Sequence, residues 1–230
     1  MFESVKYIGF DADDTLWVNE SFFRQTEDKY CKLLEKYAPP EIISQELFKT
    51  EMNNLPYYGY GIKSFVLSLL ENALRISENK IPQEIINKIL LLGKELIESP
   101  LELIDGVEEV VKLLYRKYPL IVVTKGDLLD QERKLKLSGL ENYFHHVEIM
   151  SEKKESDYKK LLNHMGIKPR EFLMIGNSLR SDILPVLELG GYGVYLPFHT
   201  VWAHENVTDH SPDNTRYKEI KTIRELLDIL

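Results

Sequence analysis

The chain has 230 residues, of which 43% are hydrophobic and 29% charged, and this composition excludes a disordered tail, a collagen and a disulfide-stapled miniprotein. At about 150 residues per domain, the length predicts one or two domains that bury a core without a structural metal. The 37 acidic and 29 basic residues give a net charge of −8, which excludes general binding to nucleic acid polymers or anionic membranes. The single cysteine, Cys31, forms no internal disulfide, and we find no signal peptide or long apolar run, so we expect a cytoplasmic protein.

The first predicted element is a short strand over residues 5–10, which ends in the acidic sequence DADDT. From about residue 20 to 98, apolar side chains recur every three or four positions, which is typical of amphipathic helices. We predict four helices in this stretch, including one over 41–53 and one over 82–97 that opens with a proline in its first turn. We expect these helices to pack together as a bundle.

In the second half of the chain, predicted helices and strands alternate. The strands cover residues 120–124, 147–150, 172–175 and 193–196, and the helices cover residues 106–117, 127–138, 156–165 and 182–189. Thr222 and Glu225 form a capping box that opens a last helix. This alternation indicates an α/β fold with a doubly wound parallel sheet that is covered on both faces. We therefore predict a core of residues 1–18 and 99–230, interrupted by an inserted helical domain of residues 19–98.

Polar residues follow the predicted strands at the sheet edge where this fold class binds ligands. They are Asp11, Asp13, Asp14 and Thr15 after the first strand, Thr124, Lys125 and Gly126 after the second, Glu152, Lys153 and Lys154 after the third, and Gly176, Asn177, Ser178, Ser181 and Asp182 after the fourth. In an extended strand Asp11 and Asp13 share one face, and carboxylates that close repel unless a cation such as Mg²⁺ neutralises them or one is protonated. The hydroxyl of Thr124 and the N–H groups of Lys125 and Gly126 can grip phosphoryl oxygens. Taken singly, each group also has an ordinary role in a turn, a helix cap or a solvated surface.

In their order along the whole chain, the motifs FDADDTLW, VVTKG, a following lysine and IGNSLRSDI resemble the haloacid dehalogenase-like hydrolase superfamily. The resemblance implies a Rossmann-like core with the helical insert as a cap domain. It implies that Asp11 is a nucleophile that forms an aspartyl phosphate, and that Asp13 is the general acid and base. It also implies that Thr124 and a lysine hold the phosphoryl oxygens, and that Asp11, the carbonyl of Asp13 and the fourth motif hold Mg²⁺.

Two positions in these motifs leave alternatives open. The family's fourth motif usually opens with Gly-Asp, but here the glycine is followed by Asn177 and an acid appears only at Asp182. We expect Asn177 near the metal, with Asp182 as a ligand or as an acceptor beside it. For the third motif we prefer Lys153, which lies five residues before Tyr158, while Lys154 remains an alternative.

The resemblance implies a Mg²⁺-dependent phosphatase whose partner is a small phosphorylated metabolite, such as a nucleotide, sugar or other organic phosphate. Asp13 argues against a dehalogenase, because hydrolysis of that ester intermediate requires no protonated alcohol. A phosphomutase on the same core is an alternative. A non-catalytic regulatory protein is another, suggested by Asn177 at the position where the family's fourth motif usually has an aspartate. A signalling receiver domain is disfavoured, because it is about half as long and its aspartate ends a middle strand. The residues Tyr57, Tyr58 and Tyr60 either contact substrate or pack between two helices of the insert.

Overall fold

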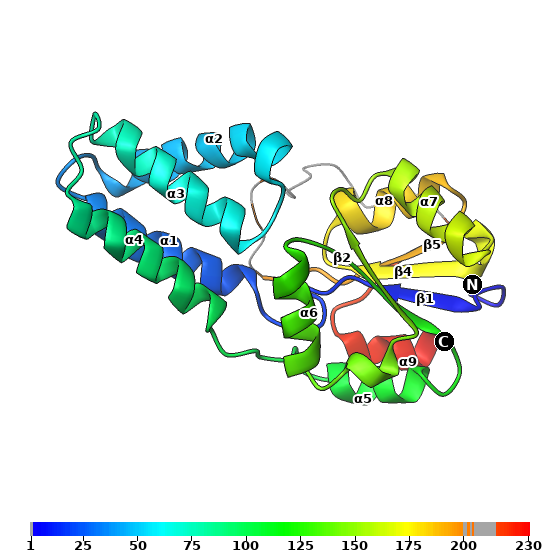
Figure 1. Cartoon of the computed structure of the whole chain (residues 1–230). Helices are drawn as coiled ribbons and strands as arrows, with labels where there is room; N and C mark the ends of the chain where they lie inside the picture. Colours follow the sequence, from blue (N-terminus) through cyan, green and yellow to red (C-terminus); the bar gives the residue numbers. More distant parts are fainter. Residues whose placement is uncertain (1, 200–201, 203, 205–214) are drawn as a thin grey trace. The chain divides into compact units, whose positions relative to one another are not determined.

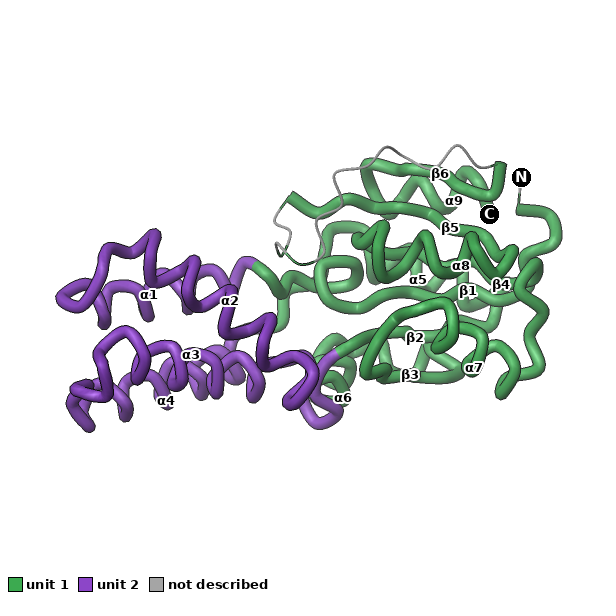
Figure 2. Tube along the Cα trace, turned by 90° about the horizontal axis from the view of Figure 1, so that it is seen from above, with its two compact units in different colours: residues 1–20, 101–125, 131–230 green, residues 21–100, 126–130 purple. Residues whose placement is uncertain are grey.

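The computed structural model describes residues 2–199, 202, 204 and 215–230 (Figure 1). The chain divides into two compact units (Figure 2). The first, here called the α/β unit, contains Met1–Glu20, Leu101–Lys125 and Gln131–Leu230, and the second, the helical unit, contains Ser21–Pro100 and Gly126–Asp130. Within the described ranges, no helix is both long enough and apolar enough to cross a membrane.

The described residues of the α/β unit form a six-stranded parallel sheet with the strand order β3-β2-β1-β4-β5-β6. The strands are β1 (Tyr7–Phe10), β2 (Leu120–Lys125), β3 (His146–Met150), β4 (Phe172–Gly176), β5 (Tyr192–Tyr195) and β6 (Tyr217–Glu219). This order confirms the predicted doubly wound sheet, in which ligands bind where the strand order reverses, here between β1 and β4. β6 has no counterpart among the predicted strands, because three residues are too few to show a periodic pattern.

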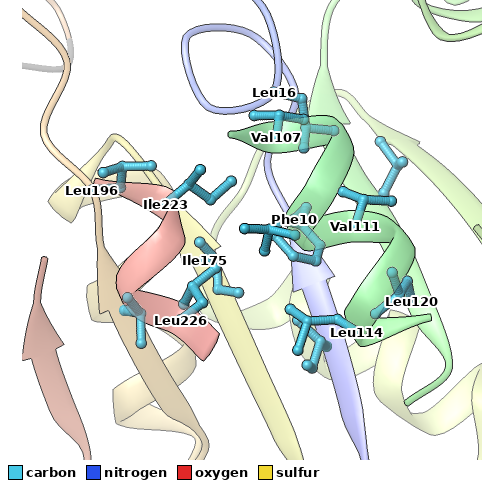
Figure 3. Close-up of a cluster of buried hydrophobic side chains, with 14 of the residues drawn as sticks. Phe10, Leu16, Val107, Val111, Leu114, Leu120, Ile175, Leu196, Ile223 and Leu226 are labelled. Atoms are coloured by element: carbon cyan, nitrogen blue, oxygen red, sulfur yellow. The ribbon is translucent and has the colours of Figure 1, made fainter. Parts of the chain in front are cut away.

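Apolar residues on both faces of the sheet are buried. Ile8, Phe10 and Val122 pack on one face with α5 (Val107–Leu114) and α9 (Leu226–Ile229), as Figure 3 shows for part of this cluster. The intervening strand residues face the other side, where they pack with α7 (Glu155–Met165) and α8 (Leu184–Glu188); they include Ile121, Val123, Phe172 and Met174. Burial on both faces explains why β2 and β4 are continuous apolar runs.

The helical unit contains the four predicted helices: α1 (Glu20–Leu34), α2 (Pro40–Tyr58), α3 (Ile62–Ile76) and α4 (Gln83–Ile97). They enclose a core of their own, which includes Tyr30, Leu34, Ile43, Leu47, Leu69 and Ile89. α2 is five residues longer at its C-terminus than predicted, because the helix continues through Pro56 and stops at Gly59, which has a φ of +68°. Tyr57 and Tyr58 therefore lie in the last turn of α2, with 80% and 54% of their surface exposed.

Among the described residues, one further helix is α6 (Leu128–Leu137), whose first three residues belong to the helical unit and the rest to the α/β unit. The α/β unit also has the single turns η1 (Glu141–Tyr143), η2 (Pro169–Glu171), η3 (Leu179–Ile183) and η5 (Ile223–Glu225). The predicted helix over 182–189 divides into the π-helical turn η3 and the helix α8. Pro185 stands in the first turn of α8, where its missing N–H is tolerated, and the carbonyl of Ser181 on η3 accepts the hydroxyl of Tyr158 at 3.0 Å. The capping box of Thr222 and Glu225 is present and opens η5.

Candidate active site

Asp11 lies directly after β1, at the point where the strand order of the sheet reverses. Its N–H donates to the carbonyl of Ile175 on β4 at 2.8 Å, which extends the pairing of the two strands by one residue. The carboxylate is buried, and its two oxygens accept different donors. Thr15 Oγ1 donates to Oδ2 at 3.1 Å, and Lys153 Nζ donates to Oδ1. The side chain of Asp11 is therefore fixed at both oxygens.

The chain turns immediately after Asp11, because the carbonyl of Ala12 accepts the N–H groups of Thr15 and Leu16 at 3.2 and 2.8 Å. Asp11 and Asp13 would share one face only in an extended strand, and this condition is not met, because β1 ends at Phe10. Asp14 is the turn residue, with a φ of +61°. Its buried carboxylate accepts the N–H groups of Asn19 and Glu20 at 2.8 and 3.0 Å and so caps the first turn of α1. Burial raises the pKa of Asp14 to about 7, and the N–H of Asn19 acts against this rise.

Asp13 has its own set of donors, which come from the turn and from α6. Trp17 Nε1 donates to Oδ1 at 2.7 Å, and Lys134 Nζ donates to the same oxygen at 3.0 Å. Gln131 Nε2 donates to Oδ2 at 2.8 Å. Gln131 and Lys134 are not among the site residues predicted from the sequence. Their spacing of three residues, which places both on one side of α6, is a weak sequence signal for this pair.

Lys153 lies between two carboxylates in the interior of the α/β unit. Its ammonium donates to Oδ1 of Asp11 and, at 2.7 Å, to Oδ1 of Asp182. Burial alone lowers the pKa of Lys153, but the negative charges of Asp11 and Asp182 outweigh burial and raise it, so the side chain stays an ammonium. Burial in turn raises the pKa of Asp11 to about 7 against the attraction of Lys153. Lys154, in contrast, is exposed at the N-terminus of α7, where its N–H donates to Asp157 Oδ2 at 3.2 Å.

Asp182 is positioned by η3 and by a glycine. Its Oδ2 accepts the N–H of Ser178 at 3.0 Å, so both carboxylate oxygens receive hydrogen bonds from the protein. A Cβ atom on Gly176 would lie 2.3 Å from Oδ2 of Asp182. Only glycine at position 176 therefore allows Asp182 to approach the end of β4 and reach Lys153.

The other predicted site residues surround the ends of β2 and β4. Asn177 Oδ1 accepts the hydroxyl of Thr15 at 3.4 Å, and the same hydroxyl contacts Asp11. Thr124 is buried at the end of β2, where its hydroxyl donates to the carbonyl of Lys125 at 3.2 Å. Lys125 Nζ donates to the hydroxyl of a serine on η3, Ser181, at 3.0 Å. These contacts connect the first, second and fourth motifs at one edge of the sheet.

The donor atoms at this edge fit a hard cation. Within the described part of the chain, no group of three or more His, Cys, Asp and Glu side chains is arranged to hold a metal ion. The carboxylate of Asp11 and the amide oxygen of Asn177 are nevertheless close together, because both accept the hydroxyl of Thr15. Oxygen ligands in small number suit Mg²⁺, which keeps several of its waters. Asp182 accepts Lys153 Nζ at one oxygen and the N–H of Ser178 at the other, and it shares Lys153 with Asp11.

The motifs that form this site also match a known family. A family model described as a haloacid dehalogenase-like hydrolase matches residues 5–190, a range that contains every site residue described above. The chain belongs to the haloacid dehalogenase-like hydrolases. The family that the motifs resemble is thereby confirmed, and this hydrolase has the α/β fold expected of it.

Curated relatives of this hydrolase include two enzymes that are named phosphatases. N-acylneuraminate-9-phosphatase from Homo sapiens is 24% identical over 214 residues, which cover 88% of this chain and 84% of the relative. Glyceraldehyde 3-phosphate phosphatase from Pyrococcus furiosus is 23% identical over 211 residues, which cover 86% of this chain and 80% of the relative.

Solved structures share the fold over nearly the whole chain. A haloacid dehalogenase-like family hydrolase from Xanthomonas campestris is 34% identical, with a TM-score of 0.89 over 98% of this chain and 90% of that one. A 2-haloacid dehalogenase from Pseudomonas syringae is 17% identical, with a TM-score of 0.66 over 98% of this chain and 97% of that one. At such low identity, the second comparison concerns the fold alone.

Proposed function

We propose that this hydrolase is a Mg²⁺-dependent phosphatase for small phosphate monoesters, such as nucleotide, sugar or other organic phosphates. The observation that carries the proposal is the pair of aspartates after β1. Asp11 is buried against Lys153, whereas Asp13 is held by a separate set of donors. Such a pair can supply a nucleophile and a proton donor to one reaction. The names of the relatives from Homo sapiens and P. furiosus support the same reaction.

The reaction proceeds in two steps through Asp11. In the first step a carboxylate oxygen of Asp11 forms a bond to phosphorus, the bond from phosphorus to the leaving oxygen breaks, and Asp13 gives that oxygen a proton. In the second step Asp13 takes a proton from water, whose oxygen attacks phosphorus and releases phosphate and the Asp11 carboxylate. Dividing hydrolysis in this way replaces one difficult step by two easier ones.

The other site residues bind charge. The Lys153 ammonium, the Thr124 hydroxyl and the N–H of Lys125 hold the phosphoryl oxygens. Asp11, the carbonyl of Asp13 and Asn177 would hold Mg²⁺, with Asp182 as the acceptor that positions Lys153. When bound, the cation reduces the repulsion between the carboxylate nucleophile and the phosphate dianion.

In this proposal, residues 1–18 and 99–230 carry out the reaction, and residues 19–98 select the substrate. A site that grips only phosphate does not distinguish one monoester from another, so specificity requires further contacts. The exposure of Tyr57 and Tyr58 at the end of α2 supports their availability to a ligand, because neither side chain is needed to fill the core of the helical unit.

A phosphomutase is the second candidate, because it uses the same first step and differs only in the acceptor of the phosphoryl group. Release of inorganic phosphate into solution, rather than a phosphorylated isomer, distinguishes the two reactions. Dehalogenation is disfavoured, because Asp13 has no task in it. A non-catalytic regulatory role is disfavoured because Asp11 and Asp13 are both retained.

The test is the release of phosphate from p-nitrophenyl phosphate with and without Mg²⁺. We expect Mg²⁺-dependent turnover that Asp11→Asn abolishes while the protein stays folded, measured by circular dichroism. Asp13→Asn should reduce turnover of alkyl phosphates by about 10²–10⁴-fold, and that of aryl phosphates less, because nitrophenol leaves without a proton. Near-normal activity of Asp11→Asn would show that the nucleophile is assigned wrongly.

A further inference from the structure

The side chain of Gln131 on α6 is buried at the site and only partly satisfied. Its amide nitrogen donates to Oδ2 of Asp13 at 2.8 Å and to the carbonyl of Lys125 at 3.0 Å. Both neighbours are acceptors, so the chemistry fixes which end of the amide faces them. The amide oxygen, Oε1, is buried and has no hydrogen-bond partner in the described part of the chain. A buried acceptor of this kind is unfavourable unless a donor reaches it at some stage.

The contacts of Asp13 distinguish its two carboxylate oxygens. Oδ1 accepts both Trp17 Nε1 and Lys134 Nζ, which occupy its two acceptor sites. Oδ2 accepts the amide of Gln131, which leaves a second acceptor site on that oxygen. Lys134 is anchored in turn by a 2.7 Å hydrogen bond to Asn19 Oδ1. Oδ2 is therefore the oxygen of Asp13 at which a proton can be added or removed without breaking one of these contacts.

We propose that Gln131 orients the water that hydrolyses the aspartyl phosphate, an inference that rests on the proposed function. One hydrogen of this water is donated to Oε1 of Gln131, and the other passes as a proton to Oδ2 of Asp13. The water oxygen forms the new bond to phosphorus, and the bond between phosphorus and Asp11 breaks with its electron pair returning to the carboxylate. The amide nitrogen of Gln131 donates to Oδ2 of Asp13, and its amide oxygen would accept the water, so one side chain would contact both the base and the water.

Lys134 has a different part in this arrangement. It is a positioning residue, because it acts on the water only through Oδ1 of Asp13. A direct role for Gln131 in the second step predicts that its loss slows hydrolysis of the intermediate, while formation of the intermediate from an aryl phosphate continues. Loss of a merely structural contact would slow both steps or neither.

The experiment is rapid-mixing kinetics of nitrophenolate release from p-nitrophenyl phosphate with the full chain and Mg²⁺. In Gln131→Met, which replaces the amide by an apolar chain of similar length, we expect the initial burst at the wild-type rate. The steady phase after the burst should be slower by about 100-fold, the cost of a small misplacement of a reacting group. Gln131→Asn, whose amide is one methylene shorter, carries the same expectation and replaces Gln131→Met if that variant does not fold. The control is Glu132→Met, an exposed position on the same helix, which should leave both phases unchanged.

Three results separate this inference from the function on which it rests. A folded Gln131→Met protein with a wild-type steady phase overturns the inference and leaves the phosphatase assignment intact. Equal slowing of the burst and the steady phase also overturns it, because the side chain would then act on Asp13 in general. A wild-type protein that releases no phosphate overturns the proposed function and the inference together.

Discussion

Asp11 and Asp13 are separated by a single residue, yet their carboxylates are held by different donors. The carboxylate of Asp11 accepts hydrogen bonds from Thr15 and Lys153 inside the α/β unit. The carboxylate of Asp13 accepts hydrogen bonds from Trp17 and from two side chains of α6. The turn at Ala12 causes this separation, because it redirects the chain immediately after the strand. Two identical side chains thereby acquire surroundings that suit two different chemical tasks.

The most consequential single residue for stability at the site is Lys153. In Lys153→Met the carboxylates of Asp11 and Asp182 lose their shared cation in a buried setting. We expect the free energy of unfolding to fall by about 3–5 kcal/mol, as is typical when one partner of a buried ion pair is removed, and phosphatase activity to be lost. Chemical denaturation measures the change. Lys154→Met is the matched control, and because this neighbour is exposed its effect should stay within about 0.5 kcal/mol.

Equal destabilisation by the two lysine variants would contradict the assignment of Lys153 to the third motif. Near-normal turnover of Lys153→Met would contradict its role at the phosphoryl group. The sequence leaves the two lysines open because they are adjacent and both follow β3. Their difference arises from the start of α7, which turns Lys153 inward and leaves Lys154 at the helix terminus.

Asn177 gives a prediction about the metal. Asn177→Asp adds a negative charge beside Asp11, at the hydroxyl of Thr15, and should tighten Mg²⁺ binding to the substrate-free protein by about tenfold or more. Isothermal titration with Mg²⁺ measures the affinity. Asn163→Asp, at an exposed position of α7, makes the same change in net charge and should have little effect. An unchanged affinity in Asn177→Asp would mean that Asn177 does not ligate the cation.

At the scale of secondary structure, η3 is the element that shapes the fourth motif. The sequence predicts a helix there and places its start within a few residues, because IGNSLRSDI has a serine and polar residues that suit a helix N-terminus. The π-helical turn itself is held in part from outside, because the carbonyl of Ser181 accepts the hydroxyl of Tyr158 on α7. A contact between residues so far apart in the chain leaves no local pattern, so sequence periodicity alone does not reveal it.

Tyr158→Phe tests the contact between α7 and η3. Removal of the hydroxyl deletes the buried hydrogen bond from Tyr158 to the carbonyl of Ser181. We expect the free energy of unfolding to fall by about 0.5–1.5 kcal/mol, the usual contribution of one hydrogen bond, as measured by urea denaturation. Tyr115→Phe, at a side chain that is 41% exposed, is the control and should change stability by less than about 0.5 kcal/mol. Equal effects of the two variants would remove the special role of the Tyr158 hydroxyl.

On the scale of the whole molecule, strong local signals made much of the fold predictable. The buried strands β2 and β4 are apolar runs, and the four helices of the helical unit repeat their apolar residues every three or four positions. The site residues could be listed because strand ends meet at one edge of a parallel sheet. Gln131 and Lys134 could not be identified, since they reach Asp13 across more than 100 residues of sequence.

Substitutions at the end of α2 test whether residues 19–98 select the substrate. Tyr57→Ala and Tyr58→Ala should change the relative kcat/KM values among nucleotide, sugar and small organic phosphates. They should leave the thermal unfolding temperature close to that of the wild type, because both side chains are largely exposed. The control is Leu74→Ala, a 39% exposed side chain on α3 that lies outside the last turn of α2. The same substrate preference in all variants would exclude these tyrosines from specificity.

The position of β1 has a consequence for biosynthesis. This strand leaves the ribosome before the other strands of the sheet, yet it lies in the middle of the sheet and pairs with β2 and β4, whose residues are translated more than 100 positions later. Its pairing therefore closes long loops, which is intrinsically slow. Ser21–Pro100, in contrast, is a continuous stretch with a core of its own and can fold while the rest is still being translated. The nascent chain thus carries an unpaired apolar strand ahead of the helical bundle until β2 emerges, and one edge of that strand stays unpaired until β4 emerges. Because unpaired strand edges favour aggregation, this interval exposes the chain to aggregation and to chaperones.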